Sequence, residues 1–293
     1  MSSFFGGAVT MICIQQIENS SDSKVLDFLN RFEETSQFLI NNLSTYGPRL
    51  TDHHNSGNFK AILKNEEIIG VFCLSLRGNL LIQTSEPLAS KLIAEDCGKE
   101  SHLIKGLIGD WNSVAPLFEY LKKSNSDFAP TLIEKEVLYR LDLKSEHQNL
   151  VKDQRVRFLN ENDFDPWLVQ SKLYNEELNL PNPLSEDQIR HSFNEAVLRK
   201  MWWGLFENSR LLSRAGLNSS GNKVGQVGGV FTPHEYRKQG LAKSTMLHML
   251  CDCRDHFGHY KSILFTGESD VAARKLYESI GYSHIGYFGL ILS

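Results

Sequence analysis

The chain has 293 residues, of which 41% are hydrophobic and 23% charged, the composition of a globular protein long enough for two domains. Its net charge of −4 argues against a general attraction to nucleic acid or to an anionic membrane, so any basic site must be local. The mildly apolar residues 1–14 are too few for a membrane span and lack the basic flank of a signal peptide. We therefore expect a cytoplasmic protein with no nucleic acid and no membrane among its partners.

Hydrophobic spacing predicts the elements of the first half in turn. Residues 25–43 are expected to form two short helices, and residues 59–76 a hairpin with a bulge at Gly70. A strand, a helix, a strand, a helix and a last strand follow at 80–84, 88–94, 103–108, 114–122 and 132–143. The polar residues 144–148 indicate a linker, which gives two domains at 1–145 and 149–293.

The second half repeats the order of the first. It begins with a strand at 156–159, a helix at 163–177 with Asp163 as its N-cap, and a helix at 186–200 that follows Pro181 and Pro183. The remaining elements are expected at 201–206, 211–217, 227–232, 241–257, 262–265, 271–280 and 285–292. Each half thus reads as helix pair, hairpin, strand, helix, strand, helix, strand. This order predicts a tandem repeat of one α/β unit.

The five cysteines give no redox framework or metal site. Cys251 and Cys253 have the spacing of half a metal site, but they fall inside a predicted helix, and no second Cys or His pair with zinc spacing follows. We expect free thiols, buried or partly buried, and no metal.

One stretch, residues 226–250, carries the clearest signal for an anion site. An apolar strand ends at Pro233, and the basic loop Arg237-Lys238-Gln239-Gly240 leads directly into a helix. The first N–H groups of a helix have no partner within it, the helix dipole is positive there, and glycine lets a ligand approach the backbone. Arg237, Lys238 and Lys243 add positive charge. The stretch is therefore expected to bind a phosphate-like group.

A second stretch, residues 268–282, follows the next strand and forms a compact helix. Ser269 or Asp270 can cap it, and Gly281 ends it. The side chains that share one helical face are Ala273, Leu276, Tyr277 and Ile280.

Together the two stretches resemble the motifs of the GNAT superfamily of acetyl-CoA-dependent N-acetyltransferases. Arg237 to Ala242 matches the motif Q/R-x-x-G-x-G/A, and V-F-T-P-H-E-Y-R before it is similar to the family variant V-Y-T-P-P-E-Y-R. The second stretch is similar to N-x-x-A-x-x-L-Y-x-x-x-G-F, with Asp270 at the Asn position and Tyr282 at the Phe position. The resemblance implies an α/β (α+β) fold of two tandem GNAT-like domains, each a mixed central sheet flanked by helices.

The resemblance also implies a cofactor, a reaction and residue roles. Acetyl-CoA is the co-substrate, and its acetyl group passes directly to a primary amine on a small molecule or a peptide. Tyr277 is the acid that protonates the leaving thiolate; a packed core tyrosine is the alternative. The residues expected to contact acetyl-CoA are Val230, Thr232, Arg237, Lys238, Gln239, Gly240, Leu241, Ala242, Lys243, Asp270 and Tyr277.

No general base is evident from the sequence. Glu176 and Glu177 resemble an acidic E-E-x-G segment in two-half GNAT proteins with a degenerate amino-terminal half, so either could bind or deprotonate an amine; solvated surface glutamates are the alternative. His234 is another candidate, and a water-mediated base is a further one. Trp202 and Trp203 are expected to line the cleft or the core.

The first half lacks the anion loop, since Thr84-Ser85-Glu86-Pro87 has no Arg/Gly signature. A second cofactor site there and a degenerate copy are both considered, and the degenerate copy is preferred. Only one strand follows Gly281 where the family has two, so the last strand is either absent or supplied by the other half. Alternative functions are a non-catalytic acyl-CoA sensor or partner-binding module, and transfer of another acyl or an aminoacyl group. The oligomeric state is not indicated.

Overall fold

The computed structural model describes residues 12–84, 86, 89–144, 150–178 and 185–293. The chain divides into two compact units. The first unit comprises the residues up to Ile133 together with Gly289–Ser293, and the second comprises Glu134–Phe288. The expected domains, 1–145 and 149–293, were separated at a linker that falls on residues outside the described ones, and those domain limits stay a prediction.

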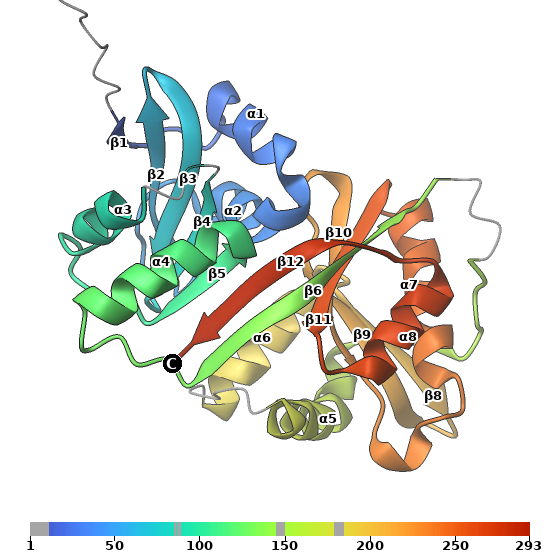
Figure 1. Cartoon of the computed structure of the whole chain (residues 1–293). Coiled ribbons are helices and arrows are strands. Elements are labelled where there is room, and N and C mark those ends of the chain that lie inside the picture. Colours follow the sequence, from blue (N-terminus) through green and yellow to red (C-terminus); the bar gives the residue numbers. More distant parts are fainter. Residues whose placement is uncertain (1–11, 85, 87–88, 145–149, 179–184) are drawn as a thin grey trace, which may run out of the picture. The chain divides into compact units, whose positions relative to one another are not determined.

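The first unit is a five-stranded sheet with helices on both faces (Figure 1). Its elements are β1 (Ile12–Gln16), α1 (Ser23–Arg31), α2 (Glu33–Tyr46), β2 (Gly57–Lys64), β3 (Glu67–Ser75), β4 (Asn79–Thr84), α3 (Ser90–Cys97), β5 (Gly106–Asp110) and α4 (Trp111–Ser124). The strand order is β1-β2-β3-β4-β5, antiparallel except for the parallel pair β4 and β5. Because side chains alternate along a strand, Val71 packs into the α1/α2 core and Phe72 into the α3/α4 core.

The second unit has the same two-faced construction. Its elements are β6 (Leu132–Asp142), β7 (Val156–Phe158), α5 (Phe164–Glu177), α6 (Glu186–Leu198), β8 (Trp202–Glu207), β9 (Arg210–Ser219), β10 (Val224–Phe231), α7 (Leu241–Asp255), β11 (Lys261–Gly267), α8 (Val271–Ile280) and β12 (Ser283–Leu292). The strand order is β12-β6-β11-β10-β9-β8-β7. Trp203 packs with the α7 and α8 residues, and Trp202, its neighbour in β8, packs with α5 and α6.

The strand beside β11 comes from an unexpected place in the sequence. β6, which we assigned to the end of the first half, pairs antiparallel with β11 over seven residues, from Lys261 with Asp142 to Gly267 with Glu136. Only one strand, β12, follows Gly281, as expected. β6 therefore occupies the place of the strand that the carboxy-terminal half does not itself supply.

The element order confirms the internal repeat. From α1 to β6 and from α5 to β12 the chain runs through helix pair, hairpin, strand, helix, strand, helix and strand. The predicted bulge at Gly70 is present as a register shift between Ile62 and Leu63, whose partners are Gly70 and Ile68. β1 was not predicted, and β5 begins at Gly106 rather than at residue 103, because the N–H groups of Lys105 and Gly106 both bond the carbonyl of Gly78. Among the described residues, no helix is both long and apolar enough to cross a membrane.

Candidate active site

The two parallel strands of the second unit separate soon after they pair. β10 and β11 share three residue pairs, from Val224 with Lys261 to Gln226 with Ile263, although both strands continue further. Beyond this point β10 stays paired with β9 through a bulge, and β11 stays paired with β6. Gly229 lies in the bulge with φ +60°, and a Cβ there would lie 2.5 Å from the ring of Trp202. Only glycine fits this position without strain.

Helix α7 begins at the end of β10, and its first turn is open. Gly240 is its N-cap, with φ +76° and ψ 4°, and no side chain caps the helix. A Cβ built on Gly240 would have no atom within 4 Å. The helix has 15 residues, so it carries a full dipole, and no side chain caps its first N–H groups. This geometry suits an anionic group, as the sequence predicts.

Arg237 does not direct its charge at the start of α7. Its Nη2 donates to both carboxylate oxygens of Glu177 at 2.7 Å, and its Nε donates to the carbonyl of Thr232 at 2.9 Å. The Thr232 hydroxyl donates to Ser213 Oγ at 2.9 Å. The ion pair of Arg237 with Glu177 therefore holds the loop against the end of α5. From the sequence we expect Arg237 to contact acetyl-CoA and Glu177 to bind or deprotonate the amine. Glu176 is exposed and adjacent.

The other loop residues keep their predicted positions at the helix start. Lys238, with φ +63°, and Gln239 are exposed, as is His234 in the short turn of residues 234–236. Leu241 is buried in the core. Three expected contacts, Val230, Ala242 and Lys243, are half-buried. Lys243 donates to the carbonyl of Ser279 near the end of α8.

Helix α8 carries Tyr277, and Asp270 caps the start of this helix. The Asp270 carboxylate accepts a hydrogen bond from the N–H of Ala273 at 2.9 Å. Tyr277 is 8% exposed, and its ring meets those of Tyr139 and Tyr282 edge to face. Burial raises its pKa well above the usual range, so the hydroxyl stays protonated at neutral pH. Among the described residues the hydroxyl has no hydrogen-bond partner.

Glu136 is a candidate functional residue that sequence reasoning missed. It lies on β6 opposite Gly267, and its Oε2 is buried without a partner among the described residues. Burial, with a smaller contribution from Glu134, raises its pKa to about 7. Its charge also interacts with Tyr277. The available signal was an acid just before the apolar residues Val137 to Tyr139, but the sequence did not indicate that this strand lies beside β11.

Arg214, on β9, is the second residue that was missed. It is 2% exposed, and its Nε has no partner among the described residues. Its guanidinium is enclosed by the rings of Trp167, Tyr174 and Trp202. Burial lowers its pKa to about 10, so the group remains a cation at neutral pH. In the sequence it reads as an ordinary charged position in an alternating strand.

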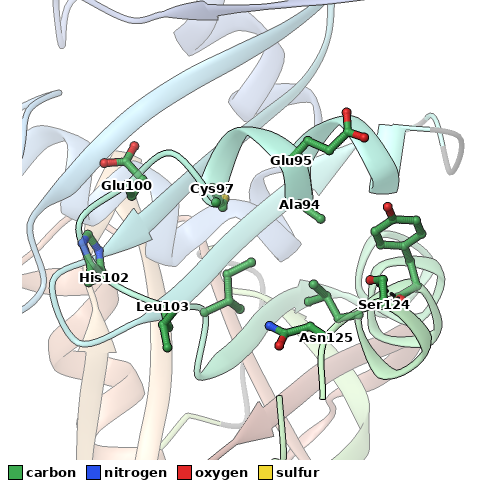
Figure 2. A pocket seen from close by; sticks show the side chains of 12 residues that line it. Ala94, Glu95, Cys97, Glu100, His102, Leu103, Ser124 and Asn125 are labelled. Carbon is green, nitrogen blue, oxygen red and sulfur yellow. Dashed lines mark hydrogen bonds between the residues drawn. The ribbon is translucent and has the colours of Figure 1, made fainter. Parts of the chain in front are cut away.

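A separate cavity of about 230 Å³ lies in the first unit. Figure 2 shows His102 and Glu100 at one end of it and Ser124 and Asn125 at the other. Glu100 is already bonded to Lys60 and Asn58, while both ring nitrogens of His102 are buried without a described partner. No lining residue belongs to either motif, so we do not assign acetyl-CoA to this cavity.

The cysteines are free thiols, as expected, and four of them are buried, but Cys13 on β1 is exposed, contrary to the expectation. Cys251 and Cys253 are buried, and the side chain between them, Asp252, accepts hydrogen bonds from Trp203 Nε1 and Lys152 Nζ at 2.9 and 2.7 Å. Within the described part of the chain, no group of three or more His, Cys, Asp or Glu side chains is placed to hold a metal ion.

Comparison with known proteins agrees with this geometry. The model of the acetyltransferase (GNAT) family matches residues 167–282. No curated protein matches the chain significantly. Several solved structures share the fold at low identity. A GCN5-related N-acetyltransferase from Sphaerobacter thermophilus has a TM-score of 0.61 at 10% identity, covering 96% of this chain and 95% of its own.

Two further structures match nearly the whole chain, and one of them is described as a tandem GNAT protein. A tandem GNAT protein from the clavulanic acid biosynthesis pathway has a TM-score of 0.56 at 11% identity, covering 97% of this chain and 98% of its own. A GNAT-family acetyltransferase from Colwellia psychrerythraea has a TM-score of 0.53 at 14% identity, covering 96% and 100%. These likenesses confirm the expected fold. Residues 167–282 therefore belong to the GNAT family of acetyltransferases.

Proposed function

We propose that the second unit is an acetyl-CoA-dependent N-acetyltransferase that moves an acetyl group directly to a primary amine on a small molecule or a peptide. The observation that carries this proposal is the open start of α7, where Gly240 leaves unfilled space after a strand, β10, that has separated from β11. The first amides of α7 would hold the pyrophosphate, and the half-buried Val230 would pair with the pantetheine. A cytoplasmic location is part of the same proposal.

The chain's own residues can supply the proton transfers that the reaction needs. The amine nitrogen bonds to the acetyl carbon, the carbon–sulfur bond breaks, and the thiolate takes a proton. Tyr277 holds a protonated hydroxyl for that thiolate. Glu136 holds a buried carboxylate that can accept the proton of the amine, a role for which a pKa near the working pH is favourable. Glu177 is less suited to this role, since its carboxylate is paired with Arg237.

The test is a calorimetric titration of the full chain with acetyl-CoA, followed by turnover on a panel of primary amines. We expect one site per chain and transfer to some amines. Two equivalent sites would place a second cofactor in the first unit. Tight binding without turnover on any amine would favour an acyl-CoA sensor, and a larger thermal shift with longer acyl chains would favour another acyl donor.

A further inference from the structure

The second unit buries a cation that has no carboxylate partner. Arg214 is 2% exposed, and among the described residues no carboxylate lies within ion-pair distance of it. Burying an unpaired charge is costly, so buried arginines are normally paired with an acid. The three aromatic rings around Arg214 stabilise the cation through their faces, with its Cζ 4.9 Å from the ring centre of Trp202. They leave the directional N–H group of Nε unsatisfied.

A second unsatisfied donor belongs to one of the rings that pack against Arg214. The ring of Trp167 is 5.4 Å from the Arg214 Cζ, and its buried Nε1 has no described partner. A carboxylate has two oxygens and can accept from two N–H groups at once. Arg214 and Trp167 together therefore form the kind of donor pair that binds a carboxylate.

Tyr174 also feels the charge of an acid, Glu136, whose Oε2 is buried. The charges of Arg214 and Glu136 both interact with Tyr174, and the two side chains form no ion pair with each other. The Glu136 charge also interacts with Tyr277, the residue that we propose as the acid of the acetyl transfer. Tyr174 keeps part of its surface exposed, which gives a molecule from solvent a place to approach. The cluster thus presents an unpaired cation and an unpaired acid to the same neighbourhood.

We propose that the acceptor is an amino acid or similar molecule that carries a carboxylate as well as the reacting amine, with Arg214 binding the carboxylate and Glu136 facing the amine. This inference rests on the proposed function. The ammonium group gives a proton to Glu136, the free amine nitrogen bonds to the acetyl carbon, the carbon–sulfur bond breaks, and the nitrogen releases its second proton to water. The thiolate takes the Tyr277 proton, and the product is an N-acetylated carboxylate. The two protonation states of the enzyme are restored by exchange with water.

The experiment compares each acceptor with its amide, in which the carboxylate charge is removed and the amine is kept. Glycine, β-alanine and 4-aminobutyrate, each paired with its amide, are assayed with acetyl-CoA and the full wild-type chain. We expect kcat/KM to be roughly 10- to 100-fold higher for the acid of at least one pair, the range of a charged hydrogen bond. Equal values, or higher values for every amide, would overturn the inference.

Variants then test whether Arg214 causes the preference for the acid over the amide. Arg214→Gln should reduce the acid-to-amide ratio to about one, and Arg214→Lys should retain part of it. The control Arg254→Gln, in which a half-buried arginine paired with Asp255 is changed, should leave the ratio at the wild-type value. A ratio unchanged in Arg214→Gln would overturn the role of Arg214. If that variant does not fold in a thermal melt, the wild-type ratio still decides the acceptor class.

The inference and the proposed function fail in different ways. If acetyl-CoA does not bind to the wild-type chain, the proposed function is wrong, and this inference falls with it. If acetyl-CoA binds and amines are acetylated without regard to a carboxylate, only the inference is wrong. Calorimetric binding of the preferred acid to the chain saturated with CoA, weakened at least 10-fold by Arg214→Gln, would support the inference independently of turnover.

Discussion

The two units contain the same succession of elements, a strand followed by a helix, a parallel strand and a second helix. They differ at the end of the first strand and at the start of the first helix. In the first unit, Ser113 of α4 accepts a hydrogen bond from the N–H of Thr84 at 3.0 Å and donates to its carbonyl at 2.9 Å. Thr84 is the last residue of β4. Both of its backbone groups are therefore occupied by a side chain of the same unit. In the second unit the residue at the same third position of the helix is Ala273, which has no hydroxyl.

Two more positions have an apolar, buried residue in the first unit and a different residue in the second. The seventh residue of α4 is the buried Leu117, whereas the seventh residue of α8 is Tyr277. The N-cap of α3 is Ala89, 1% exposed and in the right-handed helical conformation, whereas that of α7 is the exposed Gly240.

The carbonyl of Phe231, the last residue of β10, also accepts a hydrogen bond within its own unit, from Ser213 Oγ at 3.3 Å. The two units therefore differ in which element bonds the end of the strand, not in whether it is bonded. These differences support the interpretation of the first unit as a degenerate copy.

The largest effect is expected at Tyr277, which stands at the helix position that Leu117 occupies in the first unit. Tyr277→Phe should lower turnover by roughly 10²–10⁴-fold, the range for a positioned acid, because it removes only the hydroxyl. Stability should change little, since that hydroxyl has no partner among the described residues. The matched control is Tyr282→Phe, whose hydroxyl is hydrogen-bonded to Ser262 at 2.6 Å. The control should lose about 1–3 kcal/mol of stability and keep its turnover. Wild-type turnover in Tyr277→Phe would remove Tyr277 from the mechanism.

A single substitution can place a negative charge at the open start of α7. Gly240→Glu should weaken acetyl-CoA binding by about 100-fold or more, because a carboxylate would stand where the helix amides meet the pyrophosphate. Gly258→Glu is the control, since Gly258 has φ +66° and equally open surroundings but follows the other end of α7. The backbone strain is then similar in both variants. Calorimetry should separate them, and equal affinities would mean that the anion site is elsewhere.

Glu136 should make the stability of the second unit depend on pH. Its folded-state pKa of about 7 lies above the ordinary 4.5, so between these values the folded protein holds a proton that the unfolded chain has released. The free energy of unfolding therefore falls as pH rises through this window and levels off above it. Glu136→Gln should be up to about 3 kcal/mol more stable than wild type at pH 8, with the difference vanishing by pH 4. Denaturant unfolding at both pH values measures this, and a constant difference would contradict it.

The smallest effect is expected in the first unit, where Ser113 bonds the backbone of Thr84 at the end of β4. Ser113→Ala should cost about 1–3 kcal/mol of stability, because the N–H and carbonyl of Thr84 lose their partner. It should not create a second acetyl-CoA site, since Leu117 and Ala89 remain. Thermal melts give the first result and titration stoichiometry the second. Two bound acetyl-CoA molecules per chain would show that Ser113 alone closes the first copy.

Local pattern was sufficient for most of the fold and for half of the candidate site. α8 was predicted with its bounds, since Asp270 and Gly281 mark its two ends, and the open start of α7 followed from Gly240 before an amphipathic run. Both features depend on residues close together in the sequence.

The rest of the site depends on contacts between distant residues, which no periodicity encodes. Whether Glu136 lies beside Tyr277 depends on the pairing of β6 with β11, more than 100 residues apart. The pairing of Arg237 with Glu177 and the burial of Arg214 among three aromatic rings are similar cases. Charged side chains in these positions look like solvated surface until the fold brings them together.

The division of β12 between the units has a consequence for synthesis on the ribosome. Gly289–Ser293 belong to the first unit, where Ile291 is fully buried with Leu107 and Val114. The first unit therefore cannot complete its core when its own 133 residues have emerged; it waits for the whole second unit to be translated. At roughly 5–20 residues per second that delay is on the order of 10–30 s. Until then an incomplete apolar surface stays exposed, which makes the nascent chain a natural client for chaperones.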